Sequence, residues 1–376
     1  MPISGGRLAS IDIVRGYSIL SMVLAHLGSG GVLFAVTHVH PGFDGASGFV
    51  LLSGLVLGIV QHRRLRTAGP RAVEVRTLRR LGLLYVAQFA ISLLAVLVVQ
   101  RDRLASPDTT GEVVLGLVTM QIAPSVGNIL RMYVVFFCLA LAAYWMLSRG
   151  RAALLLCCSF ALYVLGAFVA PEYTTFTRDL TNAEGYSWAG WQLLFFSALV
   201  VGWYWESHDL LGRLQRHAWP VLGVAAGVLV ATRIGYHWVP SWFDKGTFAP
   251  ARILVAYGAV AFLVVLVDLL LARVPRPLFR PLESTGRRSL DSYLIHAAIG
   301  IVAVAGLGLA RGDLLAFTAF AVCWGWAELR EKVHAVRRRG LSATDAGSSA
   351  GRRPSPAWTR PVRAGRPPVR PSDPPC

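Results

Sequence analysis

Charged residues are scarce in this chain, and lysine is almost absent from it. Only 15% of the 376 residues are charged, 55% are hydrophobic, and the mean hydropathy is +0.53. Of the 37 basic residues, only Lys245 and Lys332 are lysine. A soluble domain of this size carries more charge, so the composition indicates a multi-pass membrane protein. Because the arginine bias is typical of a GC-rich bacterial genome, we expect the inner, or plasma, membrane of a bacterium.

Cysteine is also rare, and its pattern argues against a metal centre or a disulfide framework. Four of the five cysteines lie in apolar runs, the fifth ends the chain, and none has metal-ligand spacing. We therefore predict no metal ion and no bound cofactor. A cleavable signal peptide is not expected either, because the first apolar run lacks a small-residue cleavage site and carries Asp12 and Arg15.

Apolar segments of spanning length make up most of the chain and predict an all-α transmembrane bundle of about ten spans. The separation of the last two spans is the least defined, because only Arg311, Gly312 and Asp313 mark the boundary between them. The expected spans are residues 10–28, 44–61, 80–99, 129–148, 152–170, 188–205, 217–235, 250–272, 289–310 and 313–329.

The distribution of basic residues over the connections predicts the orientation of these spans. With ten spans, the connections and termini on one side of the membrane carry 28 basic residues and the connections on the other side carry five. Arginine and lysine accumulate on the cytoplasmic side. Both termini are therefore predicted to be cytoplasmic, with Arg15 towards the cytoplasm and His26 towards the outside.

The end of the chain differs from the rest and divides the prediction into two regions. Residues 1–335 form the expected membrane domain, and residues 336–376 form a basic, Pro- and Arg-rich cytoplasmic tail with too little apolar content to fold. The tail arginines suit anionic lipid headgroups. Nucleic-acid binding has no supporting fold or aromatic pattern, so membrane lipids are the expected partner.

The first span carries three polar residues that a lipid-facing helix would not tolerate without cost. Asp12 and Arg15 lie near its start and His26 lies at its end. Eleven positions separate Arg15 from His26, which places both on one helix face about 16 Å apart. Asp12 and Arg15 could pair as i and i+3 neighbours, or could simply begin the span at the membrane surface, with Arg15 extended to the headgroups.

Asp44 opens the second span from the same side as His26. A carboxylate beside a histidine can fix the imidazole tautomer and raise its basicity, so Asp44 is a candidate for orienting His26. It could equally be the N-cap of the second helix. The GxxxG sequence from Gly54 to Gly58 predicts close contact between the second span and the first.

Later spans contain further polar residues that could bind substrate from the outer half of the membrane. Asp291 and His296 lie five residues apart near the start of the ninth span and are secondary candidates. The substrate-binding candidates in these later spans are Arg131, Gln192, Lys245 and Arg252.

Six stretches, in order along the chain, together resemble the OpgC family. They are DIVRGYSILSMVLAH at 12–26, FDGASGFVLLSGLVLG at 43–58, NILRMYVV at 128–135, SWAGWQLLFF at 187–196, KGTFAPARILVAYGAVAFLV at 245–264 and GRRSLDSYLIH at 286–296. Proteins of this family attach succinyl groups to osmoregulated periplasmic glucans and belong to the type-three membrane acyltransferases. The Arg-x10-His first helix of that superfamily corresponds to Arg15 and His26.

The resemblance implies an O-acyltransferase that takes an acyl group, such as succinyl, from cytoplasmic acyl-CoA to a carbohydrate hydroxyl outside. His26 would then be the general base and Asp44 its orienting group. Asp12 and Arg15 would face the donor, with Arg15 binding its anionic groups. The arginines between Arg63 and Arg80 and between Arg273 and Arg288 could attract the nucleotide, or could serve only as topology signals.

A transporter or flippase of a polar or lipid-linked substrate is the alternative reading. In that class the same polar residues would line a translocation path without bond-making. The sequence shows neither an internal repeat of fixed period nor many Pro-broken spans, which counts against this class.

Overall fold

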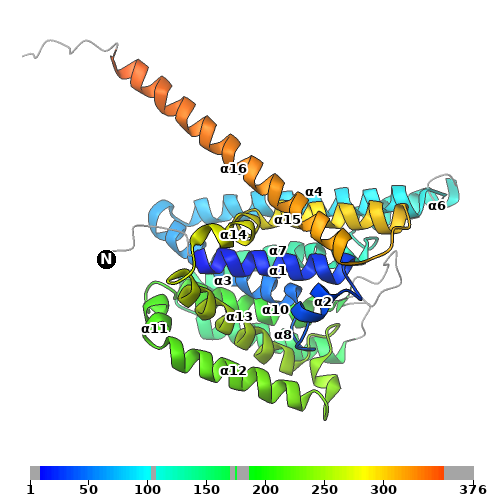
Figure 1. Ribbon diagram of the computed structural model, residues 1–376, viewed down its shortest axis with the longest axis horizontal. Coiled ribbons are helices and arrows are strands. Elements are labelled where there is room, and N and C mark those ends of the chain that lie inside the picture. The colour runs from blue at the N-terminus through cyan, green and yellow to red at the C-terminus, as the bar shows by residue number, and fades with distance from the viewer. Residues whose placement is uncertain (1–8, 103–106, 170–173, 176–185, 351–376) are drawn as a thin grey trace, which may run out of the picture. The chain divides into compact units, whose positions relative to one another are not determined.

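The computed structural model describes residues 9–102, 107–169, 174–175 and 186–350 (Figure 1). Part of the predicted tail, residues 351–376, and parts of two predicted external connections lie outside the described residues. Two compact units are distinguished, Met1–Leu329 and Arg330–Cys376. The described residues are helical, without strands, as predicted for an all-α membrane protein.

The helices follow the apolar segments, with short helical turns at several connections. The α-helices of the first half are α1 (Ala9–Leu27), α2 (Val32–Thr37), α3 (Gly45–Ala68), α4 (Pro70–Val99), α6 (Pro107–Val118), α7 (Asn128–Ser148) and α8 (Ala152–Phe168). Those of the second half are α10 (Trp188–Trp203), α11 (Leu210–Arg216), α12 (Ala218–Gly235), α13 (Pro250–Leu271), α14 (Arg280–Arg287), α15 (Ser289–Ile299) and α16 (Asp313–Ala350). The 3₁₀ turns are η1 (Ser125–Gly127), η2 (Pro240–Phe243) and η3 (Arg276–Phe279), and a π-helical segment, η4 (Gly300–Gly306), continues α15.

Seven helical segments of the described chain are long and apolar enough to cross a membrane, compared with ten predicted spans. Two further predicted spans correspond to the shorter apolar helices α8 and α10. The last predicted span, residues 313–329, corresponds to the start of α16. Three charged residues, Asp313, Glu328 and Arg330, fall within 18 residues there, so this stretch is not among the seven. α16 continues to Ala350, so helix extends beyond residue 335, where the sequence predicted the tail to begin.

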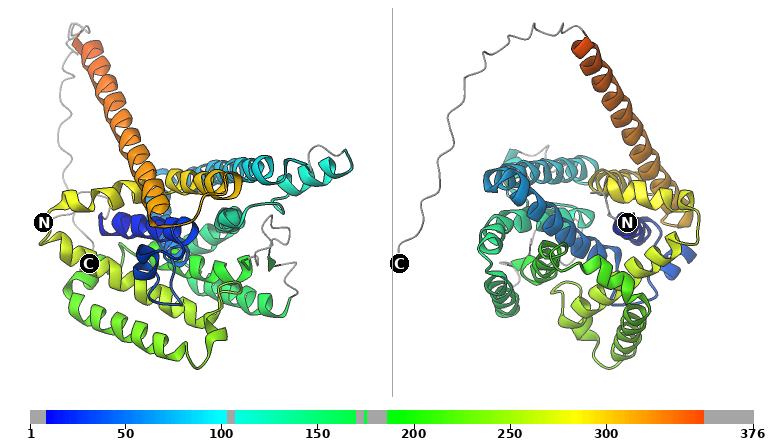
Figure 2. Two further views of the ribbon diagram at one scale, coloured as in Figure 1. Left: turned by 45° about the vertical axis from the view of Figure 1, so that its right-hand side comes forward. Right: turned by 90° about the vertical axis from the view of Figure 1, so that its left-hand side faces the viewer.

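α1 and α3 are the inner helices of the first unit. In their most apolar 18-residue stretches, 72% of the residues are buried, compared with 6% in α12. α1 packs against α3, α13, α14 and α15, and α3 packs against α10 (Figures 1 and 2). α12 contacts α13 and leaves its other faces exposed, as expected for a lipid-facing helix. The polar residues of α1 therefore lie among other helices.

Two close helix contacts depend on glycine. A Cβ on Gly16 would lie 1.9 Å from the carbonyl oxygen of Leu282, and a Cβ on Gly286 would lie 1.8 Å from that of Asp12. Any larger side chain at either position would force α1 and α14 apart. These glycines bring the start of α1 directly onto α14.

The GxxxG sequence of α3 makes a contact different from the predicted one. A Cβ on Gly54 would meet the carbonyl oxygen of Phe195, and one on Gly58 that of Leu199, both on α10. α1 is instead approached by Gly45, whose Cβ would lie 2.2 Å from the carbonyl oxygen of Ser18. The prediction that Gly54 and Gly58 pack against the first span is wrong. These two glycines lie on the face of α3 that meets α10, whereas Gly45 lies against α1.

Candidate active site

Arg15 and His26 of α1 both reach α15, at two points seven residues apart. Nη2 of Arg15 donates a hydrogen bond of 2.7 Å to Oγ of Ser289, the first residue of α15. Nδ1 of His26 lies 3.3 Å from Nε2 of His296. Seven residues are about two helical turns, so Ser289 and His296 share a face of α15. α1 and α15 thus run parallel, with the arginine at one end of the contact and the histidines at the other.

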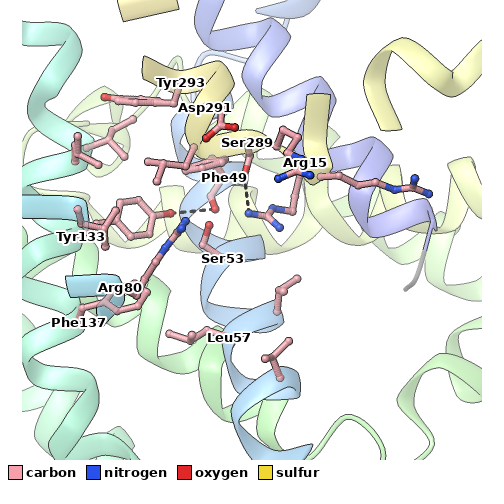
Figure 3. Close-up of a pocket in the computed structure, with 18 of the residues that line it drawn as sticks. Arg15, Phe49, Ser53, Leu57, Arg80, Tyr133, Phe137, Ser289, Asp291 and Tyr293 are labelled. Carbon is pink, nitrogen blue, oxygen red and sulfur yellow. Dashed lines mark hydrogen bonds between the residues drawn. The ribbon is translucent and has the colours of Figure 1, made fainter. Parts of the chain in front are cut away.

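A cationic cavity of about 370 Å³ opens at the Arg15 end (Figure 3). Arg15 enters from α1 and Arg80 from α4, and Ser53 lies on α3 between them. Six arginines line the cavity, namely Arg15, Arg64, Arg76, Arg80, Arg287 and Arg288, together with the single carboxylate Asp291. A lining with this excess of positive charge favours an anionic ligand carrying several phosphate or carboxylate groups.

The lining arginines come from the two basic connections that the sequence analysis singled out. Arg64 lies near the end of α3, Arg76 and Arg80 lie in the first half of α4, and Arg287 and Arg288 lie at the end of α14. A second, more open hollow of about 490 Å³ shares Arg64, Arg76 and Arg80 and adds Arg79. The arginines therefore form a continuous cationic surface that leads into the cavity.

Aromatic residues close the inner end of the cavity and connect it to the histidines. The ring of Phe49 lies 5.8 Å from that of Tyr133 and 6.4 Å from that of Tyr293, measured between centroids. Tyr293 in turn meets His296 edge to face at 5.1 Å. The guanidinium carbon of Arg15 lies 5.9 Å from the centroid of Phe49. One wall of Phe49 and Tyr293 thus separates the charged cavity from the histidine pair.

His26 and His296 form a stacked pair at the other end. Their rings are 5.5 Å apart with an interplanar angle of 3°. His296 is fully buried, whereas His26 keeps partial exposure. Within the described part of the chain, His26 makes its hydrogen bond through Nδ1, to His296, and not through Nε2. His26 is therefore a mostly buried imidazole whose Nδ1 is held by His296.

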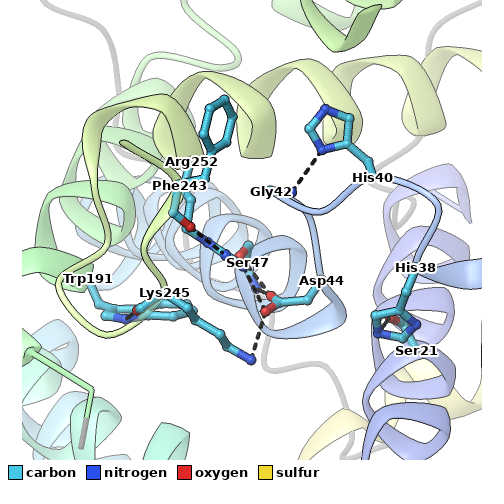
Figure 4. A network of polar contacts seen from close by, with 10 residues as sticks. All are labelled: Ser21, His38, His40, Gly42, Asp44, Ser47, Trp191, Phe243, Lys245 and Arg252. Atoms are coloured by element: carbon cyan, nitrogen blue, oxygen red, sulfur yellow. Dashed lines mark hydrogen bonds and ion pairs between the residues drawn. The ribbon is translucent and has the colours of Figure 1, made fainter. Parts of the chain in front are cut away.

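Asp44 serves as the N-cap of α3 and lies in an ion-pair cluster (Figure 4). Its Oδ1 accepts from the backbone N–H and the hydroxyl of Ser47, both at 2.8 Å. Its Oδ2 lies 2.8 Å from Nζ of Lys245 and 2.9 Å from Nη2 of Arg252. The N-cap reading is confirmed. Among the described residues the hydrogen-bond partner of His26 is His296, so an influence of Asp44 on His26 would act through space.

The charges of this cluster stabilise one another. Burial alone would raise the pKa of the Asp44 carboxyl, but Lys245 and Arg252 hold that pKa well below its usual range. Burial would lower the pKa of Lys245, and Asp44 raises it above the ordinary lysine value. The Asp44 carboxyl and the Lys245 amine are therefore both charged at neutral pH.

The remaining predicted site residues have structural partners. Asp12 pairs with Arg287 of α14 at 3.6 Å between Oδ2 and Nε. Arg131 is fully buried and donates to Oδ1 of Asn128 and to the carbonyl of Met120. Substrate-binding roles for Asp12 and Arg131 stay predictions.

Gln192 joins two helices through both ends of its amide. Its Oε1 accepts from the hydroxyl of Ser159 at 2.6 Å, and its Nε2 donates to the carbonyls of Ser159 and Ala189. These bonds hold α10 to α8. The structure thus accounts for this buried amide by helix packing, and its predicted contact with substrate stays a prediction.

The sequence patterns marked His296 only as a secondary candidate, grouped Arg80 with the basic connections and did not single out Tyr293. The seven-residue spacing of Ser289 and His296 was a usable signal, because it marks one face of a helix. Within the described residues, no group of three His, Cys, Asp or Glu side chains could hold a metal ion.

Comparison with known protein families gives a match that covers nearly the whole chain. Residues 7–334 match the family described as OpgC protein. No curated protein and no solved structure matches the chain.

Proposed function

Because the chain belongs to the OpgC family, which indicates a membrane acyltransferase-type protein that modifies glucans, we propose that it is an acyl-CoA-dependent O-acyltransferase. The donor, succinyl-CoA or a similar thioester, approaches from the cytoplasm, and the acceptor is a glycan hydroxyl on the outer side. The observation that carries this proposal is the position of the cationic cavity and of His26 at opposite ends of the same helix contact.

The membrane arrangement that this function requires is ten crossings of a bacterial inner membrane with both termini in the cytoplasm. The segregation of 28 basic residues against five supports it. The parallel course of α1 and α15 also supports it, since the first and ninth of ten spans cross in the same direction. The arginines of the cavity then face the compartment that holds acyl-CoA.

The cavity suits the nucleotide end of coenzyme A. Its phosphates are polyanionic, and guanidinium groups bind phosphate oxygens in pairs and stay charged at all physiological pH values. Arg15 of α1 lies beside Phe49 and Ser289. There it would contact the donor where the pantetheine arm leaves the cavity. The arm would pass the aromatic wall to present the thioester to His26.

The chemical step then requires only one base. Nε2 of His26 takes the proton of the acceptor hydroxyl while that oxygen attacks the thioester carbonyl carbon. The tetrahedral intermediate collapses, the carbon–sulfur bond breaks, and coenzyme A leaves as a thiolate. The proton passes from His26 to the sulfur, which regenerates the neutral histidine and yields an ester and free coenzyme A.

The experiment is to incubate purified protein in lipid nanodiscs with acyl-labelled succinyl-CoA or acetyl-CoA and a glucan acceptor. We expect label on the glucan and release of one free thiol for each ester formed. If the protein neither binds nor consumes any acyl-CoA but moves glycan across vesicle membranes, the transporter reading replaces this proposal.

A further inference from the structure

The His26–His296 contact raises a question that base catalysis leaves open, namely which nitrogen of His26 carries a proton. A neutral imidazole has one N–H and one lone pair, and only the lone pair can accept a proton from substrate. In many enzymes a carboxylate fixes this choice. Asp44 has no hydrogen bond to His26 and is held by Ser47, Lys245 and Arg252. Another group must therefore set the tautomer.

The first hydrogen bond that fixes the tautomer is made by the backbone of α15. Nδ1 of His296 lies 3.3 Å from the carbonyl oxygen of Ser292, one helical turn earlier. A carbonyl oxygen only accepts hydrogen bonds, so Nδ1 of His296 carries the proton. The same carbonyl accepts from the thiol of Cys323 at 3.4 Å, which holds it in place from α16. A neutral His296 then has its lone pair on Nε2.

The second hydrogen bond follows from the first. Nε2 of His296 faces Nδ1 of His26 at 3.3 Å, and since Nε2 is the acceptor, Nδ1 of His26 must be the donor. The proton of His26 thus lies on Nδ1 and its lone pair on Nε2, since the hydrogen bond of His26 within the described chain is made through Nδ1. The chain of hydrogen bonds runs from His26 to His296 to the Ser292 carbonyl.

Building on the proposed function, we infer that His296 is the positioning residue that holds His26 in the tautomer with Nε2 free for the acceptor hydroxyl. The nearly parallel stacking of the two rings and the edge contact of Tyr293 keep His296 in this orientation. When His26 takes up a proton it becomes an imidazolium, and its Nδ1–H bond to His296 becomes charge-assisted and stronger. His296 thereby favours the protonated form that exists during the reaction.

Two variants separate this role from simple packing. His296→Phe keeps a flat ring for stacking but has no acceptor for Nδ1 of His26. His296→Gln loses the ring, yet its amide oxygen reaches the position of Nε2 and can accept the same hydrogen bond. A packing role predicts that Phe is tolerated better than Gln, and a tautomer-fixing role predicts the reverse.

The test measures kcat and KM for succinyl-CoA in nanodiscs, with membrane yield and coenzyme A binding as checks on folding. We expect His296→Phe to lower kcat by at least about tenfold with KM unchanged, because the wrong nitrogen of the base is protonated in part of the molecules. His296→Gln should keep most of the activity. Equal losses in both variants, or a greater loss in His296→Gln, would overturn the inference.

The proposed function is tested separately by the wild-type protein and by His26→Ala in the same assay. An inactive wild-type protein, with any acyl-CoA, would remove the proposed function and this inference with it. An active wild-type protein, an inactive His26→Ala variant and a fully active His296→Phe variant would leave the function intact and reject the role of His296 alone.

Discussion

The two ends of α1 differ in the interactions that their residues make: charged groups line a cavity at one end, and histidines form directed hydrogen bonds at the other. At the Arg15 end, six arginines from α1, α3, α4 and α14 surround an open cavity. At the His26 end, two aromatic rings stack within a chain of directed hydrogen bonds. Long-range charge attracts a ligand without demanding one orientation, whereas proton transfer needs one atom in one place. On the proposed function, binding and chemistry are therefore separable, and variants at the two ends should affect different kinetic constants.

The largest effect is expected at the histidine end. His26→Ala removes the base and should lower kcat by about 100- to 10,000-fold with little change in coenzyme A binding. The measurement is transfer of labelled acyl groups by purified variants at equal membrane yield. His208→Ala, which changes an exposed histidine, is the matched control. A His26→Ala variant with wild-type turnover would show that the base lies elsewhere.

The ion-pair cluster next to the histidine end should govern stability. Asp44→Asn leaves Lys245 and Arg252 without their shared carboxylate. Breaking a buried ion pair costs about 3 kcal/mol of folding stability at the lower end of the usual range. The lower end applies here because the side chain of Lys245 is a third exposed. Apparent melting temperatures in detergent, wild type against variant, measure the difference at pH 7.

The pH dependence of this difference has a definite sign. The pKa of Asp44 is depressed in the folded protein, so its stabilising contribution is present above the carboxyl's ordinary pKa of about 4 and is lost as the pH falls below that value. The melting temperatures of the wild type and Asp44→Asn should therefore converge in acid. A difference that stays constant down to pH 3 would show that the charge of Asp44 is not the source of the stability.

The arginine end depends on close backbone contact, which a single methyl group should disturb. Gly286→Ala places a Cβ 1.8 Å from the carbonyl oxygen of Asp12, and overpacking of this kind costs about 1–3 kcal/mol. Gly82→Ala in α4 meets nothing within 4 Å and is the matched control. We expect lower thermal stability and weaker coenzyme A binding for Gly286→Ala only. Equal behaviour of the two variants would mean that α1 and α14 can separate without loss.

The smallest effect is expected from one cavity arginine among six. Arg80→Ala should raise the KM for acyl-CoA by about tenfold, which corresponds to about 1.4 kcal/mol, and leave kcat nearly unchanged. Arg213→Ala changes an exposed arginine of α11 and should have no effect. Since the contact is ionic, the difference should shrink at high salt. A fall in kcat without a change in KM would contradict the separation of the two ends.

The sequence was sufficient for features that depend on nearby residues. The apolar runs predicted the helices, the position of Asp44 at the start of a span offered an N-cap as one of two readings, and eleven residues placed Arg15 and His26 on one side of α1. Each of these follows from helix geometry within a few turns. The same local reasoning grouped the basic connections, and the structure brings five of their arginines to one cavity.

The sequence was insufficient where the partner is remote in the chain. His26 and His296 are 270 residues apart, and no local pattern says which helix α15 will lie against. The glycines of α3 show the same limit, because GxxxG marks a surface for close packing but does not name the neighbour, here α10. The ten-span count exceeded the seven long apolar helices because α8 and α10 are short and the start of α16 is charged.

One consequence of the α1 geometry concerns the length of the substrate. An α-helix does not stretch, so Arg15 and His26 stay about 16 Å apart along its axis. A donor anchored at the arginines can react only if its reactive carbon reaches that far, whatever acyl group it carries. Truncated thioesters that lack the nucleotide would lose the anchor, and donors with a shortened arm would bind without reacting. On the proposed function, the fixed length of α1 between Arg15 and His26 therefore selects donors by the distance between their anionic groups and their reactive carbon.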